Sequence, residues 1–309
     1  MKTIPASGGA SALAPKRQTN WDWRAATNFI AGGAGGGLLL AAAGASQAGG
    51  DVRIPVLLAL ALIGLGLTCV WFEIGRPWRA LNVYRHIQTS WMTREAAVAP
   101  FLFAAGGLLL LTAQVALAWL TGLLGLAFLY SQARMLRADK GIPAWRHPRC
   151  LPVVVSTGLT EGAGLLVLTH ALVLTDFGVG PALAPERSGW LVPGLVLLLA
   201  LRLALWRAYL AGLAGPGIPD GTRRELHAIN SGFAAAGHWL PVVLALAAWA
   251  GAPAAATLLL LAALLAVASG WHLKYTLVRR AAFTPGFDLR HLPVRGKGDA
   301  SLFVTPRES

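Results

Sequence analysis

Charged residues are scarce in this sequence, and acidic ones are the scarcest. Only 13% of the 309 residues are charged, and the chain has 13 acidic residues against 26 basic ones. Soluble domains carry about 25% charged residues, so this composition excludes an ordinary soluble fold. The apolar residues, 56% of the chain, lie in long blocks that match a membrane span in length. The sequence therefore predicts an all-α, polytopic membrane protein.

Metal-binding residues are also few. The two cysteines, Cys69 and Cys150, do not form a C-x-x-C pair, which argues against an iron–sulfur cluster, a zinc site or a covalently attached haem. A b-type haem needs two histidines at similar depth, whereas His170, His238 and His272 fall at three different depths of the predicted spans. We therefore expect no haem, no cluster and no metal site in this chain. We also expect no cleaved signal peptide, because the first twenty residues contain no apolar core.

The apolar blocks predict eight membrane helices, arranged as a 4+4 bundle. Residues 95–134 are too many for one crossing at about 1.5 Å per residue, so they should form two helices with a turn near residues 112–114. The other six spans are predicted at residues 24–45, 54–72, 151–174, 190–209, 226–249 and 254–275. This divides the chain into an N-terminal segment (1–23), a transmembrane domain (24–278) and a C-terminal tail (279–309).

The basic residues predict the orientation. In the eight-helix arrangement, 22 of the 26 Lys and Arg residues fall on one side of the membrane, together with both termini. Because cytoplasmic loops are enriched in Lys and Arg, we expect both termini in the cytoplasm and the chain in the inner membrane. Topology therefore accounts for the net charge of +13, and we do not expect nucleic acid as a partner.

The first span contains a glycine-rich run, N-F-I-A-G-G-A-G-G-G-L at residues 28–38. No predicted strand precedes it, which argues against a nucleotide-binding loop. Gly32 and Gly36, and Gly33 and Gly37, are four residues apart, so they should form a smooth groove. Such a groove favours close packing of another helix, and close approach of a flat ligand is the alternative.

Ionisable residues deep in a span are costly and are usually functional. Glu161 and Arg202 lie inside the fifth and sixth spans, and His238 lies in the seventh. We expect Glu161 and Arg202 to form an ion pair. This pair either locks two helices together or, with His238, belongs to a proton path.

The most polar stretch is residues 72–95, between the second and third spans. It contains Glu73 and Glu95 at the two helix ends, and between them lie Arg76, Arg79, His86, Trp91 and Arg94. A helix cap explains one carboxylate but not this whole set. Reaction of a quinone requires a group that exchanges protons and donors that hold the carbonyl oxygens. The stretch therefore predicts a quinone site, with Glu73 and Glu95 as proton carriers and the other five residues as quinone-binding groups.

The run G-R-P-W-R-A-L-N…T-S-W-M-T-R-E in this stretch resembles the signature of the DmsC/NrfD superfamily of membrane anchors. The glycine-rich opening is similar to that of the NrfD branch, and A-R-M-L…P-A-W-R-H-P after the fourth span resembles DmsC-type anchors. This resemblance implies a chain without its own cofactor that binds menaquinone or ubiquinone and anchors two partners, an iron–sulfur subunit and a molybdopterin catalytic subunit. Glu95 matches the acidic residue of the family's quinol site, and Glu73 stands where DmsC-type anchors often have histidine. We expect the basic loop after the fourth span to face the partners, through Arg134, Arg137, Arg146 and Arg149.

The sequence thus predicts the anchor and quinone-reactive subunit of a molybdopterin/iron–sulfur oxidoreductase complex, within membrane lipid. A secondary transporter with a midplane site at Glu161 and Arg202 is the alternative from another class. A purely structural anchor without a quinone site is the third possibility.

Overall fold

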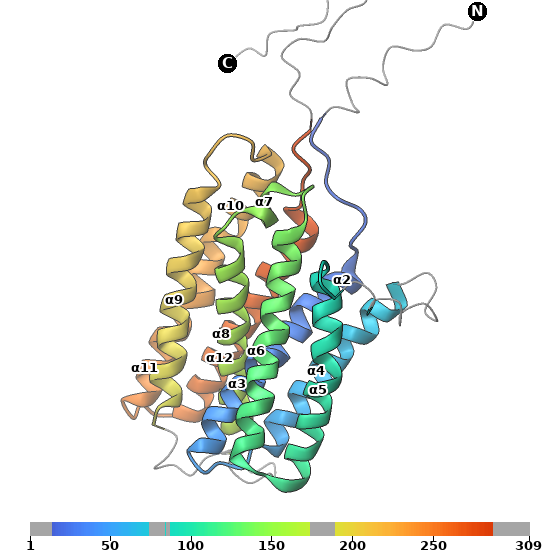
Figure 1. Cartoon of the computed structure of the whole chain (residues 1–309). Helices are drawn as coiled ribbons and strands as arrows, with labels where there is room; N and C mark the ends of the chain where they lie inside the picture. The colour runs from blue at the N-terminus through green and yellow to red at the C-terminus, as the bar shows by residue number, and fades with distance from the viewer. Residues whose placement is uncertain (1–13, 74–83, 85–86, 174–188, 287–309) are drawn as a thin grey trace, which may run out of the picture.

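The computed structural model describes residues 14–73, 84, 87–173 and 189–286, and Figure 1 shows a bundle of long helices. Eight helical spans in this part of the chain are long and apolar enough to cross a membrane, which confirms the predicted fold class. The first span combines α2 (Trp23–Thr27), the π-helical turn η1 (Asn28–Gly32) and α3 (Gly33–Gln47). The next three are α4 (Arg53–Glu73), α5 (Trp91–Thr112) and α6 (Val115–Ala138).

The second half of the chain contributes four more spans. A short helix, α7 (Pro143–Arg146), precedes α8 (Cys150–Val173), which is followed by α9 (Leu191–Gly212). The seventh span consists of α10 (Asp220–Ala234), the π turn η4 (Ala235–Trp239) and α11 (Leu240–Trp249). The eighth consists of α12 (Ala255–Tyr275) and the π turn η5 (Thr276–Arg280).

The turn between the third and fourth spans falls where it was predicted. Helix α5 ends at Thr112, and Ala113 adopts the left-handed conformation, with φ of 54°. Its backbone N–H is donated to the carbonyl of Leu109, which closes the helix end. Two residues then suffice to reverse the chain into α6.

The glycine-rich first span lies at the centre of the bundle, where α3 packs against α4, α6 and α8. A Cβ on Gly36 would lie 2.6 Å from the backbone oxygen of Gly125 in α6, and a Cβ on Gly37 would collide with the backbone of Gly158 in α8. The small residues therefore allow direct backbone contact between helices, as the spacing predicted.

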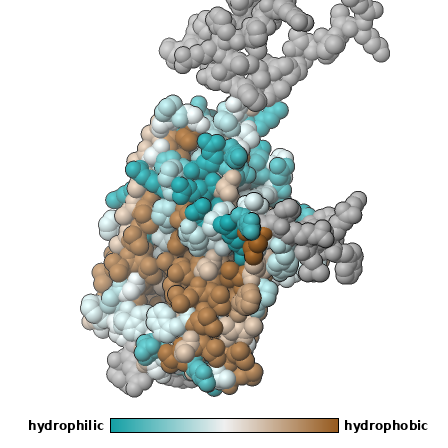
Figure 2. Space-filling view, viewed as in Figure 1, coloured by the Kyte–Doolittle hydropathy of each residue, from teal (hydrophilic) through white to brown (hydrophobic). Residues whose placement is uncertain are grey.

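The surface of the bundle has the two zones of a membrane protein. Figure 2 shows an apolar zone over most of the visible face and a hydrophilic zone at the end where α7 lies. Large apolar side chains of the spans are exposed, such as Leu111 (81%) and Phe101 (69%) of α5. In lipid such exposure carries no penalty.

The two described ends of the chain meet on one side of the bundle. The Gln18 backbone N–H is donated to the carbonyl of Ala282 (2.8 Å), and that of Thr284 is donated to the carbonyl of Lys16 (2.8 Å). This pairing agrees with an even number of crossings.

Candidate functional site

Glu95 lies inside the third span and not at its start. The prediction that this residue begins the helix was wrong. Helix α5 begins at Trp91, and the Ser90 hydroxyl accepts the capping hydrogen bond from the backbone N–H of Thr93 (3.4 Å). Glu95 therefore sits one turn within the helix and is only 4% exposed.

Two side-chain amides hold the buried carboxylate. Glu95 Oε1 accepts a hydrogen bond from Asn28 Nδ2 in η1 (3.0 Å) and another from Gln132 Nε2 in α6 (3.0 Å). The ion pairs formed by the described residues do not include Glu95. A buried carboxyl group that has only neutral partners is costly to keep charged, so this environment suits a group that gains and loses a proton.

The π turn explains how the first span reaches this carboxylate. Gln132 Nε2 also donates a hydrogen bond to the backbone carbonyl of Asn28 (2.9 Å), the first residue of the π turn η1. Asn28 Oδ1 is buried and accepts no hydrogen bond from the described residues. Asn28 thus presents a donor to Glu95 and an unused acceptor nearby. Turns of this type are frequent at functional sites.

A small pocket of about 40 Å³ adjoins this cluster. Glu95, Glu73 and Asn28 line it, and the flexible side chains of Met92 and Met135 form part of its wall. The structure therefore brings together the two carboxylates that the sequence singled out. Three other predicted quinone-binding residues, Arg76, Arg79 and His86, lie outside the described residues.

Trp91 and Arg94 lie next to this site but do not line the pocket. The guanidinium groups of Arg94 and Arg134 lie 4.2 and 4.4 Å from the ring centroid of Trp91. Arg94 also donates hydrogen bonds to the carbonyls of Ile87 (3.0 Å) and Gln88 (2.7 Å). In this conformation Trp91 and Arg94 hold the start of α5 against the preceding turn.

The expected ion pair between Glu161 and Arg202 is replaced by another. Glu161 Oε2 accepts a hydrogen bond from Lys274 Nζ in α12 at 2.5 Å, and both side chains are almost fully buried. The prediction that Arg202 is the partner was therefore wrong. The 22 basic residues assigned to one side of the membrane included Lys274, yet its side chain is 2% exposed.

Arg202 and His238 instead bind each other and the backbone. Arg202 Nε donates a hydrogen bond to His238 Nε2 (3.0 Å). The terminal nitrogens of Arg202 donate hydrogen bonds to the carbonyls of Ala266 (3.0 Å) and Gly237 (2.8 Å). His238 Nδ1 lies 2.6 Å from the carbonyl of Phe233, so this nitrogen carries the proton and the imidazole is neutral. Both nitrogens of His238 are occupied, and the Arg202 side chain joins α9 to the π turn η4 and to α12. The proton path through Glu161, Arg202 and His238 stays a prediction.

Sequence reasoning missed three polar residues at this site: Asn28, Gln132 and Lys274. Each stands near the end of an apolar span, where polar residues are common and carry little signal. A clue for Lys274 was available, because a fully buried Glu161 requires a cation or another strong donor.

The basic loop after the fourth span, residues 137–149, forms a basic platform at the hydrophilic end of the bundle. Trp145 of α7 is 2% exposed, and its indole N–H is donated to the carbonyl of Leu277 (2.9 Å). Arg137, Arg146 and Arg149 are exposed on this platform. Partial burial and the neighbouring Arg149 lower the pKa of His147 below its usual value. Arg134, the fourth predicted partner contact, is half-buried against Trp91.

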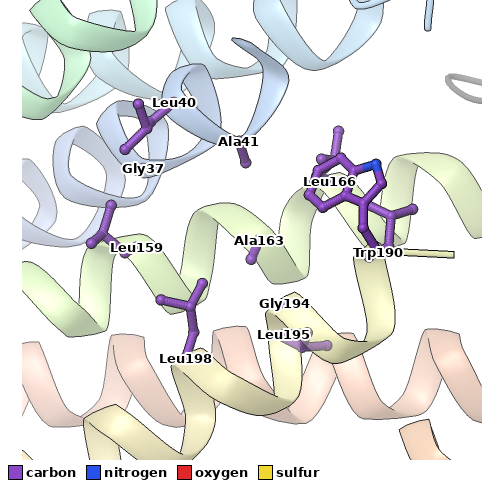
Figure 3. Close-up of a pocket in the computed structure, with 11 residues that line it drawn as sticks. Gly37, Leu40, Ala41, Leu159, Ala163, Leu166, Trp190, Gly194, Leu195 and Leu198 are labelled. Carbon is purple, nitrogen blue, oxygen red and sulfur yellow. The ribbon is translucent and has the colours of Figure 1, made fainter. Parts of the chain in front are cut away.

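A larger pocket lies away from the Glu95 pocket and shares no lining residue with it (Figure 3). It has a volume of about 200 Å³ and lies between α3, α8 and α9. Glycine, alanine and leucine residues line it together with Trp190, and none of these carries an ionisable group. This pocket suits hydrocarbon and supplies no group for proton transfer. Within the described residues, no cluster of three His, Cys, Asp or Glu residues could hold a metal ion.

Comparison with known families agrees with this architecture. Residues 37–170 match the family described as DMSO reductase anchor subunit (DmsC). The matched segment runs from α3 to α8 and includes Glu73, Glu95, Gln132 and Glu161. No curated protein matches the chain. The family match supports a DmsC-type membrane anchor, a subunit of a membrane-bound molybdoenzyme complex.

Proposed function

We propose that this DmsC-type membrane anchor carries the quinone-reactive site of its complex, at the pocket that Glu95 and Glu73 share. The observation that carries the proposal is the buried Glu95 carboxylate, held only by the amides of Asn28 and Gln132. A carboxylate needed only for helix stability would be served equally well at the exposed helix start.

Glu95 and Asn28 each have a defined part in this reaction. Interconversion of a quinol and a quinone moves two protons and two electrons. Glu95 exchanges one proton with the bound substrate, and Asn28 Oδ1, which has no donor among the described residues, accepts a hydrogen bond from a substrate hydroxyl group. The two electrons pass to or from the iron–sulfur subunit of the complex, because this chain is expected to hold no redox centre.

The pocket is too small for a quinone ring in this conformation, so binding requires it to widen. A volume of about 40 Å³ holds a small number of water molecules and not a quinone ring. Met92 and Met135 form part of the wall, and methionine side chains repack easily. We therefore expect the pocket to widen at these two residues when menaquinone or ubiquinone binds.

The test is the variant Glu95→Gln in the assembled complex. We expect turnover between a soluble quinone analogue and the complex to fall by about 100-fold or more, the usual effect of losing a proton-transfer group. Reaction of the partner subunits with an artificial electron carrier should be unchanged. Glu225→Gln is the matched control, because it makes the same chemical change on α10. Normal quinone turnover in Glu95→Gln would leave Glu95 without a role in the reaction.

We also propose that the basic platform faces the cytoplasm and binds the iron–sulfur subunit there, next to the molybdopterin catalytic subunit. Support comes from the exposed Arg137, Arg146 and Arg149 and from the large excess of positive charge predicted on this side. Alkaline phosphatase fused after Ala138 should then be inactive, and fused after Ala184 it should be active. The opposite pattern would place the partners on the other side of the inner membrane.

The transporter alternative receives no support from the buried charges. Arg202 is 0% exposed and is held by His238 and by backbone carbonyls, and Glu161, also 0% exposed, is paired with Lys274. With no exposed surface, neither side chain meets a solute in this conformation.

A further inference from the structure

We infer that the apolar pocket between α3, α8 and α9 holds one acyl chain of a phospholipid, whose ester end lies at Trp190. Helix α3 belongs to the first four spans, whereas α8 and α9 belong to the last four, so the lipid fills a seam between the two halves of the chain. Because the Glu95 pocket is built from other residues, lipid binding is independent of the proposed quinone reaction.

The lining of this pocket is suited to hydrocarbon and not to water. It consists of glycine, alanine and leucine residues and Trp190 (Figure 3). A buried water needs about two to four polar partners, and the indole N–H of Trp190 is the one polar side-chain group in the lining. An apolar cavity of roughly 150 Å³ holds a benzene ring. A pocket of about 200 Å³ therefore takes a larger hydrocarbon segment.

The pocket is a groove that follows the direction of the spans. Trp190 lies at one end of it, and Leu159 and Leu198 lie at the other (Figure 3). The residues from Trp190 to Leu198 rise about 12 Å along α9, at about 1.5 Å per residue. One leaflet contributes about 15 Å of the hydrocarbon core. The groove thus extends through most of one leaflet, which is the depth that an acyl chain occupies.

Contacts between helices close the inner end of the groove. A Cβ on Gly37 would collide with the backbone of Gly158, so α3 and α8 touch there. The Thr160 hydroxyl donates a hydrogen bond to the carbonyl of Leu198 (3.3 Å), which joins α8 to α9. The chain of a bound lipid therefore ends at this level.

Trp190 marks the end at which the lipid ester lies. It is the N-cap of α9, at the membrane-surface end of that span, and it is 40% exposed. A Cβ on Gly44 of α3 would lie 3.5 Å from its ring, so the indole lies beside α3 at the mouth of the groove. Its N–H has no acceptor among the described residues. Tryptophan favours the headgroup level of a bilayer, where ester and phosphate oxygens accept hydrogen bonds.

The groove is continuous with the lipid-facing surface of the bundle. Leu197 and Leu201 of α9 are 69% and 45% exposed, and Leu198 between them lines the partly open pocket. An acyl chain therefore enters from the surrounding hydrocarbon without crossing a polar barrier. The isoprenoid tail of a quinone fits less well, because Asn28 of the Glu95 pocket lies about 24 Å from Gly44 along the first span.

Two groove-filling variants of the assembled complex test the inference. A Cβ on Gly194 would meet only the ring of Trp190, at 3.8 Å, so Gly194→Leu fills the groove without a backbone clash. Ala163→Leu fills it from the α8 side and serves if Gly194→Leu fails to assemble. Gly107→Leu is the matched control, because it makes the same change on α5, where a Cβ meets nothing within 4 Å.

Native mass spectrometry of the complex, washed in detergent, measures the retained lipid. We expect one tightly held phospholipid per anchor chain in the wild type, in Gly107→Leu and in Glu95→Gln, and loss of this lipid in Gly194→Leu and Ala163→Leu. A wild type without phospholipid, a quinone as the retained molecule, or groove-filling variants that keep the lipid would overturn the inference. None of these results bears on Glu95, whose test is quinone turnover.

A fluorescence titration shows where the chain binds. Phosphatidylglycerol with brominated acyl chains is added to the delipidated complex in detergent, and the quenching that disappears in Trp190→Phe is assigned to Trp190. We expect this quenching to saturate at one lipid per anchor chain in the wild type and in Gly107→Leu, and to be lost in Gly194→Leu. Quenching of Trp190 that Gly194→Leu leaves unchanged would place the lipid outside the groove and contradict the assignment.

Discussion

The contact between the first and fifth spans allows a sharp test of how the site is held. Gly162 of α8 faces α3 so closely that an added Cβ would collide with the backbone of Gly37 and Leu38. Gly107 of α5 is also helical and apolar in its surroundings, yet a Cβ there would meet no atom within 4 Å. Gly162→Ala and Gly107→Ala therefore make the same chemical change in opposite packing environments.

The expected magnitudes follow from these contacts. Alanine in place of a helical glycine stabilises by about 0.5–1 kcal/mol where there is room, which is the expectation for Gly107→Ala. Overpacking costs about 1–3 kcal/mol, and backbone atoms cannot move aside as the end of a side chain can. The destabilisation caused by Gly162→Ala should therefore lie near the upper end of this range. The free energies of unfolding of the two variants should then differ by about 3 kcal/mol.

Unfolding of the purified chain by sodium dodecyl sulfate in mixed micelles measures this difference. The same displacement of α3 should move Asn28 away from Glu95, so Gly162→Ala should also impair quinone turnover in the complex. Equal stability of the two variants would refute the close contact between α3 and α8, on which the position of Asn28 depends.

Two further predictions concern the buried polar groups. Gln132→Leu removes one of the two donors to Glu95, so quinone turnover should fall, and the free energy of unfolding should drop by about 1.5–3 kcal/mol, as for a hydrogen bond to a charged group; unchanged values would show that Asn28 alone holds the carboxylate. Lys274→Met should destabilise the chain by about 3–5 kcal/mol because it leaves Glu161 without a counterion, and adding Glu161→Gln should recover most of that loss in a double-mutant cycle; additive effects would contradict the ion pair.

Much of the fold could be predicted from the sequence because the membrane fixes the length of each span. The eight spans, the turn at residues 113–114 and the glycine groove all follow from local patterns of apolar and small residues. The start of the third span was placed four residues too late. Its first turn is polar, and the Ser90 cap was not recognised there.

The site could be predicted only in part. Glu73 and Glu95 were identified because they stand at or near the facing ends of neighbouring spans, and a single connecting loop keeps such ends close together. The partner of Glu161 could not be identified in this way, since Lys274 lies 113 positions away along the chain. Which faces of distant helices meet depends on packing throughout the bundle, and apolar helices with little amphipathic pattern give no indication of it.

The most direct test of the central claim is photolabelling of the purified complex with an azido-quinone, followed by mass spectrometry of the labelled peptides. The account predicts label on the residues that line the Glu95 pocket, such as Val70, Met92 and Met135, and loss of that label when unmodified quinone competes. Label confined to the apolar pocket beside Trp190, or label at the Glu95 pocket that excess quinone does not displace, would contradict it.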